Sequence, residues 1–345
     1  MKITLMEPLG IPQTVLDGYR SKLEAAGHTF VSYASKTADP AEQAARVAGS
    51  DAVIIANTPF PAPVILGAPN LKFIDVAFTG IDHVGLDACR QKGVTLSNAA
   101  GYSTQCVAEL ALGLAVACLR FVPACDAAVR QGGTGAALRG TEICGKTVGI
   151  VGTGAIGLRT ARLFLAFGAR VIAHSRTRRQ EALDMGIEYV SLEELMERSD
   201  IVSLHVPSNG ETRRLISAPL LARMKPTAIL INAARGAVVD NAALADALNQ
   251  GRLAGAGIDV FDAEPPLPES EPLLHAKNTV LTPHVAFATD ESMLRRAEIV
   301  FHNLDAWLAG RRTSAGCERP PGFPACLLIP FPGQKNGHPA KAGGP

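Results

Sequence analysis

The sequence predicts an α/β protein with two doubly wound parallel sheets and a cleft between them. Three observations support this prediction. Short apolar runs alternate with helix-like stretches, as they do where helices join parallel strands. The alternation occurs twice along the chain, in two successive series. The 345 residues are also sufficient for two domains, each with its own core.

The first series opens with a strand at residues 3–6 and a helix at residues 14–26. Further strands are expected at residues 29–33, 52–55, 73–76 and 94–96, with helices between them. A long apolar stretch at residues 104–121 then predicts a buried helix.

The second series opens with the apolar run at residues 147–151. Its further strands are expected at residues 171–173, 201–204, 229–232, 255–258 and 279–281. The last helix, residues 291–308, has an amphipathic period, and its simplest course returns to the first domain. We therefore expect one domain from residues 1–99 plus 287–310 and a second from residues 100–286.

The composition excludes several function classes. A net charge of +1 gives no reason to expect binding to nucleic acid or to an anionic membrane. No apolar run reaches transmembrane length and the first residues lack a signal-peptide core, so a cytoplasmic location is expected. The seven cysteines form no C-x-x-C pair, so neither a metal site nor a disulfide framework is expected. Residues 311–345 are rich in proline and glycine without periodicity, and we expect a disordered tail.

The most informative motif is Gly152-x-Gly154-x-x-Gly157, which encloses Ala155 and Ile156 and directly follows the run at residues 147–151. Between a strand and a helix, the first glycine makes the tight turn, the second lets a pyrophosphate approach the backbone, and the third lets helix and strand pack closely. The phosphates would lie at the helix N-terminus, where free N–H groups favour an anion. The motif predicts a Rossmann-like dinucleotide site; the alternative is a purely structural glycine turn.

Three charged residues follow three successive late strands: Arg235, Glu264 and His284. Ligands of open α/β sheets bind beyond the carboxyl ends of the strands, so we expect these side chains to converge. A histidine can supply a proton near neutral pH, and a carboxylate on its other ring nitrogen would fix its tautomer. An arginine can hold a carboxylate or keto oxygen. Together they suit reduction of a 2-keto acid, although each alone is compatible with an ordinary surface or capping residue.

Five stretches of the second half resemble the D-isomer-specific 2-hydroxyacid dehydrogenases: GKTVGIVGTGAIG, SLHVPSNGETRRLI, LINAARGAVVDNAAL, AGAGIDVFDAEPP and NTVLTPHVA. Weaker matches in the first half are VAFTGIDHVGLDAC and SNAAGYSTQCVAELALG. The resemblance implies that Arg235 binds the substrate carboxylate and keto group, and that His284 is the acid/base with Glu264 as its partner. It also implies a homodimer built around residues 104–121 and the segment after them.

The same resemblance assigns further contacts. Asp259 would contact the nicotinamide carboxamide, and the backbone N–H groups of Thr79 and Gly80 would hold the substrate carboxylate. The other cofactor contacts that it implies are Thr104, His205, Val206, Pro207, Thr212 and Ala233.

The chain departs from the family pattern at the adenosine end of the cofactor site. The acidic residue expected about 20 residues past the glycine motif, which holds the ribose hydroxyls of NAD, is replaced by Ser175. Arg176, Arg178 and Arg179 follow. An aspartate would repel a 2′-phosphate, whereas serine and arginine can bind one. The sequence therefore favours NADP(H), with NAD(H) in a tolerant pocket as the alternative.

The expected substrate is a small or apolar 2-keto acid. The loop after residues 54–55 reads ANTPFPAP and has no arginine for a phosphorylated substrate. Phe78 could make the pocket less polar, or could be a core residue. Two alternatives remain open: an NAD-linked D-3-phosphoglycerate dehydrogenase, and a nucleotide-sensing binding protein of the corepressor type, which would need a partner protein.

Overall fold

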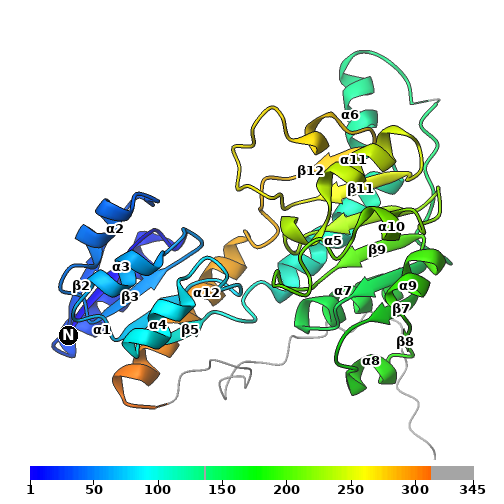
Figure 1. Ribbon diagram of the computed structural model, residues 1–345. Coiled ribbons are helices and arrows are strands. Elements are labelled where there is room, and N and C mark those ends of the chain that lie inside the picture. Colours follow the sequence, from blue (N-terminus) through cyan, green and yellow to red (C-terminus); the bar gives the residue numbers. More distant parts are fainter. Residues whose placement is uncertain (136, 312–345) are drawn as a thin grey trace, which may run out of the picture.

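The computed structural model describes residues 1–135 and 137–311, which form two α/β units (Figure 1). The prediction of two parallel-sheet domains is confirmed. The predicted disordered tail lies outside the described residues, apart from Arg311. The division of the chain after residues 99 and 286 stays a prediction.

The first sheet has five parallel strands within the described residues, in the order β2-β1-β3-β4-β5. The strands are β1 (Lys2–Leu5), β2 (Thr29–Ser32), β3 (Ala52–Ile55), β4 (Phe73–Val76) and β5 (Thr95–Asn98). The connecting helices are α1 (Gln13–Ala25), α2 (Pro40–Val47), α3 (Ala62–Gly67) and α4 (Leu86–Lys92). β3 and β4 are buried at every position, because helices cover both faces of such a sheet. This burial explains why the sequences of the two strands are almost entirely apolar.

The second sheet has seven parallel strands in the described part of the chain, in the order β12-β11-β10-β9-β6-β7-β8. The strands are β6 (Thr147–Val151), β7 (Arg170–His174), β8 (Glu188–Tyr189), β9 (Ile201–Leu204), β10 (Ile229–Asn232), β11 (Gly255–Ile258) and β12 (Thr279–Leu281). The main helices are α7 (Ala155–Ala166), α8 (Gln180–Asp184), α9 (Leu192–Arg198), α10 (Ala218–Leu221) and α11 (Asn241–Asn249). The strand order reverses between β6 and β9, beside the glycine turn that follows β6. Ligands of doubly wound sheets bind at this switch point.

The last helix, α12 (Asp290–Leu308), packs against the first sheet although it follows the second in sequence (Figure 1). Trp307 stacks on Phe73 of β4 with ring centroids 4.9 Å apart, and Phe301 stacks on Tyr19 of α1 at 3.9 Å. A capping box formed by Thr289 and Ser292 fixes the start of the helix. The chain therefore returns to the first unit directly after the loop that carries His284.

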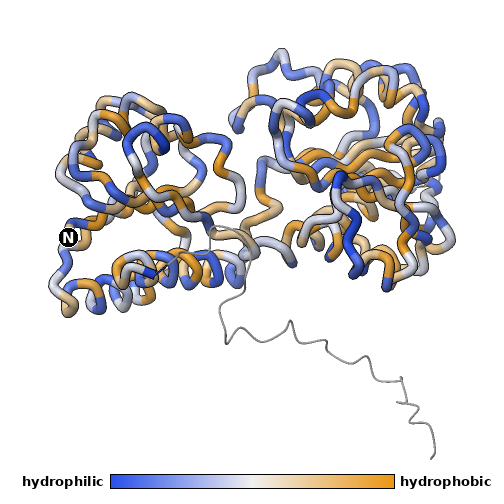
Figure 2. The backbone as a smooth tube through the Cα atoms, turned by 60° about the horizontal axis from the view of Figure 1, so that its bottom comes forward, coloured by the Kyte–Doolittle hydropathy of each residue, from blue (hydrophilic) through white to orange (hydrophobic). Residues whose placement is uncertain are grey.

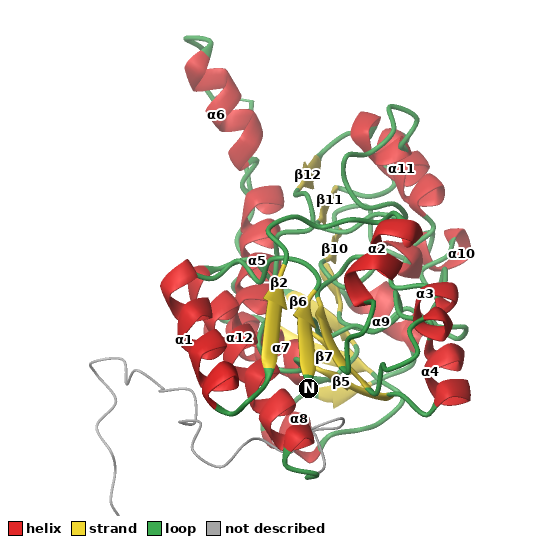
Figure 3. Ribbon diagram, turned by 90° about the vertical axis from the view of Figure 1, so that its left-hand side faces the viewer, coloured by secondary structure: helices red, strands yellow, loops and turns green. Residues whose placement is uncertain are grey.

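The long helix predicted at residues 104–121 is wrong at its C-terminal end. α5 (Thr104–Leu119) stops earlier, and α6 (Val122–Arg130) continues after a bend of 59°. Phe121, between them, has a left-handed φ of 51°, which is incompatible with a continuous helix. α6 projects away from the rest of the described chain (Figure 3). The two-residue strand β8 was also not predicted, because a strand that short shows no periodicity.

Apolar segments run through the interior of both units, and the connections are more polar (Figure 2). Within the described residues, no single helix has the length and hydropathy needed to cross a membrane. The bent pair α5 and α6 meets those two criteria only when its members are taken together.

Candidate active site

The glycine turn lies between β6 and α7. Gly152 has a left-handed φ of 99°, and a Cβ atom on it would lie 2.5 Å from the carbonyl oxygen of His205. A Cβ atom on Gly157 would overlap the carbonyl oxygen of Gly152, whereas one on Gly154 would meet no atom within 4 Å. The open space at Gly154 adjoins the N-terminus of α7. This cradle fits a pyrophosphate bound by backbone N–H groups.

Several residues with predicted cofactor contacts come together beside this turn. Ala155 and Ile156 begin α7. Ile156 packs with Ala233, which follows β10, against a small cluster of Cys106, Val107 and Ala286. Thr104 begins α5, three residues before Val107, so one end of α5 faces this part of the site.

The turn after β9 contributes a second wall. Val206 lies directly beside the glycine turn, since its Cγ1 would be 2.9 Å from a Cβ atom on Gly152. The hydroxyl of Thr212 donates a hydrogen bond to the carbonyl of Pro207 at 2.6 Å and thereby closes the turn. Burial lowers the pKa of His205 to about 3, so its ring is neutral near pH 7.

The adenosine end of the site is cationic. Ser175 follows the last residue of β7, and the exposed Arg176 forms an ion pair with Glu211 at 3.4 Å. Arg178 and Arg179 form no ion pair with any residue that the structure describes. Because residue 175 is a serine, this position offers no carboxylate to accept hydrogen bonds from the ribose hydroxyls.

Asp259, at the end of β11, is fully buried and holds the loop that carries His284. Its Oδ1 accepts hydrogen bonds from the Thr282 hydroxyl at 2.6 Å and the Val285 N–H at 2.9 Å, and its Oδ2 accepts one from the Ala286 N–H at 3.0 Å. Burial raises the pKa of its carboxyl group despite these bonds. Sequence analysis missed this anchoring role.

His284 and Glu264 are brought together as the sequence predicted. Nδ1 of His284 lies 2.9 Å from both carboxylate oxygens of Glu264. The hydrogen bond with His284 lowers the pKa of the Glu264 carboxyl group. Nε2 of His284 has no hydrogen-bond partner among the described residues, and its side chain is 16% exposed. His284 also has a left-handed φ of 54°, a conformation that non-glycine residues adopt rarely.

Arg235 reaches from the second unit to the first. The side chain of Asn232 fixes its backbone by donating to the carbonyl of Arg235 at 2.9 Å. Its Nη2 lies 3.4 Å from the carboxylate of Asp82, and a Cβ atom on Gly80 would overlap that nitrogen. The N–H groups of Thr79 and Gly80 donate no hydrogen bond to any described residue. Two backbone donors without a partner among the described residues therefore lie next to a guanidinium, an arrangement that suits a carboxylate.

Phe78 lies in an aromatic group that contacts the catalytic candidates. Its ring centroid is 4.6 Å from Phe287, 5.9 Å from Tyr102 and 6.4 Å from the His284 ring. Arg296 of α12 is buried among these rings, with its Cζ 5.5 Å from the Phe78 centroid. Burial lowers the pKa of Arg296.

Sequence analysis missed the buried Arg296, although a signal existed. Met293 and Val300 lie three residues before it and four residues after it, and both are buried. An arginine at this spacing shares the buried face of the helix.

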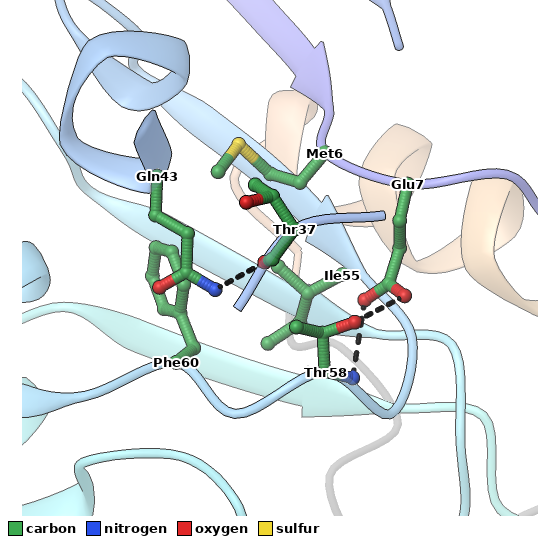
Figure 4. A pocket seen from close by; sticks show the side chains of 7 residues that line it. All are labelled: Met6, Glu7, Thr37, Gln43, Ile55, Thr58 and Phe60. Atoms are coloured by element: carbon green, nitrogen blue, oxygen red, sulfur yellow. Dashed lines mark hydrogen bonds between the residues drawn. The ribbon is translucent and has the colours of Figure 1, made fainter. Parts of the chain in front are cut away.

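A small cavity of about 10 Å³ lies at the switch point of the first sheet, where β1 and β3 diverge (Figure 4). Its polar lining comes from Glu7, Thr37, Gln43 and Thr58, and Oε1 of Gln43 has no partner among the described residues. Its volume is sufficient for about one water molecule. The cavity is separate from the His284 and Arg235 site and too small for a substrate.

Comparison with known proteins supports one family. Residues 112–286 match the D-isomer specific 2-hydroxyacid dehydrogenase, NAD binding domain. The chain is 40% identical over 291 residues to a glyoxylate reductase of Korarchaeum cryptofilum, across 81% of the chain and 87% of that protein. It is also 40% identical over 269 residues to a D-3-phosphoglycerate dehydrogenase of Mycobacterium bovis, across 77% of the chain and 51% of that protein.

A solved structure shows the same architecture. The chain superposes on an acyclic imino acid reductase in complex with NADPH and D-Arg with a TM-score of 0.82 and 30% identity. The superposition covers 90% of this chain and 98% of that one.

Proposed function

The chain belongs to the D-isomer-specific 2-hydroxyacid dehydrogenases, nicotinamide-dependent oxidoreductases, and we propose that it reduces a small 2-keto acid with NADPH. One observation carries the proposal. Residues 78–80 of the first unit contact two functional side chains of the second, since the Phe78 ring meets the His284 ring and Gly80 meets the Arg235 guanidinium. A substrate at this contact lies between an acid and an anion-binding group.

His284 is the proposed acid/base. Nδ1–H donates a hydrogen bond to the Glu264 carboxylate, which leaves Nε2 as the nitrogen that gives a proton to the keto oxygen. The same two contacts hold the ring in one orientation, with Nε2 on the side away from Glu264. Asp259 keeps the loop of His284 in place through Val285 and Ala286.

Arg235 is the proposed anchor for the substrate. Its guanidinium binds the carboxylate and the keto oxygen, and the free N–H groups of Thr79 and Gly80 hold the other side of the carboxylate. As negative charge develops on the keto oxygen, the same guanidinium stabilises it. Closure of the two units around the substrate excludes water. When bound in the glycine cradle, a reduced nicotinamide cofactor would supply the hydride that the keto carbon takes up.

NADPH is the proposed cofactor, with NADH as the alternative. The glycine cradle fits the pyrophosphate, and Ser175 and Arg176, directly after β7, are the side chains proposed to bind the 2′-phosphate. Glu211 would have to release Arg176 on binding. The similar imino acid reductase is in complex with NADPH, which is compatible with this proposal.

A short, unphosphorylated 2-keto acid is the proposed substrate class. Similarity to glyoxylate reductases covers most of this chain and most of those proteins, whereas only about half of the phosphoglycerate dehydrogenase is matched. The substrate loop at residues 56–63 carries no arginine for a phosphate. We therefore favour glyoxylate or hydroxypyruvate as the substrate over 3-phosphoglycerate.

A homodimer is proposed through the α5–α6 region. Val122 and Val129 of the projecting helix α6 are 48% and 70% exposed, so the described part of the chain leaves two apolar side chains of this helix largely uncovered. A second copy could cover them. A cytoplasmic location stays a prediction.

The experiment is a parallel assay of NADPH and NADH oxidation with glyoxylate, hydroxypyruvate and longer 2-keto acids. We expect turnover with a short 2-keto acid and a higher kcat/KM with NADPH. Turnover that favours NADH would contradict the cofactor proposal. No turnover with either cofactor, despite measurable cofactor binding, would contradict the reductase proposal and favour a sensing role.

A further inference from the structure

A continuous chain of hydrogen bonds crosses the adenosine end of the cofactor site. The N–H of Arg179 donates to the hydroxyl of Tyr189 at 3.0 Å. The Tyr189 hydroxyl donates to Oγ1 of Thr153 at 2.8 Å, and the Thr153 hydroxyl donates to the carbonyl of Thr177 at 3.4 Å. Each hydroxyl both accepts and donates, so the chain has one consistent direction.

The strand order explains how Tyr189 reaches these groups. β8 pairs with β7, and β7 pairs with β6, so Tyr189, Ala173 and Ile150 lie at one level across the three strands. The level is one residue before the carboxyl ends of β6 and β7. From there, the Tyr189 side chain crosses the end of β7 and meets Thr153, which lies inside the glycine turn between Gly152 and Gly154.

Tyr189 therefore joins two segments that bind different phosphates in the proposed function. The glycine turn holds the pyrophosphate, and residues 175–179 form the cationic loop after β7. Tyr189 also positions a charge of that loop, because Cζ of Arg178 lies 5.9 Å from its ring centroid. Thr153 is almost fully buried, which fixes the inner end of the hydrogen-bond chain.

We propose that Tyr189 and Thr153 are positioning residues that select the adenosine 2′-phosphate. They hold residues 175–179 at a fixed distance from the glycine turn, so that Ser175 and the arginines meet the 2′-phosphate while the pyrophosphate remains in its cradle. The inference rests on the proposed NADPH preference. Neither residue touches the reacting atoms, and the effect is confined to the phosphate that distinguishes NADPH from NADH.

The first test is Tyr189→Phe in the full chain. This variant keeps the ring beneath Arg178 but loses both hydrogen bonds of the hydroxyl. Dissociation constants are measured for NADPH, NADH, 2′,5′-ADP and 5′-ADP. We expect the Kd of NADPH and of 2′,5′-ADP to rise about five- to tenfold, since two hydrogen bonds order the loop. The Kd of NADH and of 5′-ADP should change less than about twofold.

The second test uses Thr153. Thr153→Val removes the hydroxyl at nearly constant volume and should reproduce the loss for the two 2′-phosphorylated ligands. Thr153→Ser keeps the hydroxyl and should restore binding. Tyr33→Phe, in the first unit, is the matched control and should leave all four constants unchanged.

The outcomes separate this inference from the proposed function. If the parent chain prefers NADPH and Tyr189→Phe keeps the NADPH/NADH ratio, the inference is wrong and the proposed function stands. Equal loss of NADPH and NADH would show that Tyr189 merely supports the fold, and would also overturn the inference. If the parent chain has no preference for NADPH, the cofactor proposal fails first, and the inference fails with it.

Discussion

The two sheets of this chain share a parallel, doubly wound architecture, yet their carboxyl edges are built differently. The edge of the second sheet presents the side chains of Arg235, after β10, and His284, after β12, together with the glycine turn. The edge of the first sheet presents backbone N–H groups at Thr79 and Gly80, beside the aromatic ring of Phe78. In the proposed function, the same architecture therefore supports chemistry at one edge and substrate recognition at the other.

This difference predicts which kinds of substitution should affect activity at each edge. A change of side chain at the second edge removes a reacting or charged group. At the first edge, only changes that move the backbone or occupy its space should matter. The two edges also differ in support. The buried carboxylate of Asp259 fixes the His284 loop through three hydrogen bonds. Residues 78–80 rest on packing and on hydrogen bonds to two of their carbonyls, from the Asn98 side chain to Thr79 and from the Ala99 N–H to Phe78.

The largest expected effect is at the second edge. His284→Asn removes the acid/base and should lower kcat by about 10²- to 10⁴-fold. The Kd of the reduced cofactor, measured by fluorescence titration, should change little, because His284 lies outside the glycine turn and the loop after β7. Near-normal turnover of this variant would contradict the assignment of His284.

A matched pair of variants tests the first edge. Gly80→Ala places a Cβ atom against Nη2 of Arg235 and should lower kcat/KM about 10- to 100-fold, as expected for a displaced charge-assisted contact. The neighbouring Thr79→Ala removes an exposed side chain but keeps its N–H, so kcat/KM should change less than about threefold. Thermal unfolding of both variants controls for folding. If Thr79→Ala were the more damaging change, recognition by the backbone at this edge would be refuted.

Cofactor choice is expected to respond more moderately. Ser175→Asp introduces a carboxylate that repels a 2′-phosphate and can accept hydrogen bonds from ribose hydroxyls. The NADPH/NADH ratio of kcat/KM should fall about tenfold or more, as a charged contact of this strength predicts. An unchanged NADPH/NADH ratio would contradict the proposal that Ser175 lies in the adenosine pocket.

The last prediction concerns stability and its dependence on pH, and leaves the activity comparison between the two edges untouched. The pKa of His205 is lowered to about 3 in the folded chain, against an ordinary value of 6.5, so the unfolded chain binds a proton that the folded chain does not. Stability from this group is complete above pH 6.5 and is lost as the pH falls towards 3, by at most about 1.4 kcal/mol per pH unit. Urea unfolding of the parent and of His205→Gln between pH 7 and 4 measures the difference. Parallel slopes would show that His205 does not couple to folding.

Much of the fold could be predicted from the sequence, because buried parallel strands are continuous apolar runs. The runs at residues 52–55 and 201–204 coincide with β3 and β9. The break at Phe121 and the short strand β8 could not be predicted, since one depends on a single backbone conformation and the other on pairing with β7.

The candidate site divides in the same way. The sequence by itself determined which residues follow strands, and therefore that Arg235, Glu264 and His284 would share an edge with the glycine turn. Only the tertiary structure decided that Asp259 anchors the His284 loop, that Arg296 lies buried beside Phe78, and that Tyr189 joins Thr153 to the loop after β7. The physical reason is the distance along the chain between the residues that interact. Strand order and chain direction are encoded locally, by hydrophobic pattern and glycine, whereas side-chain partners depend on contacts between segments far apart in sequence.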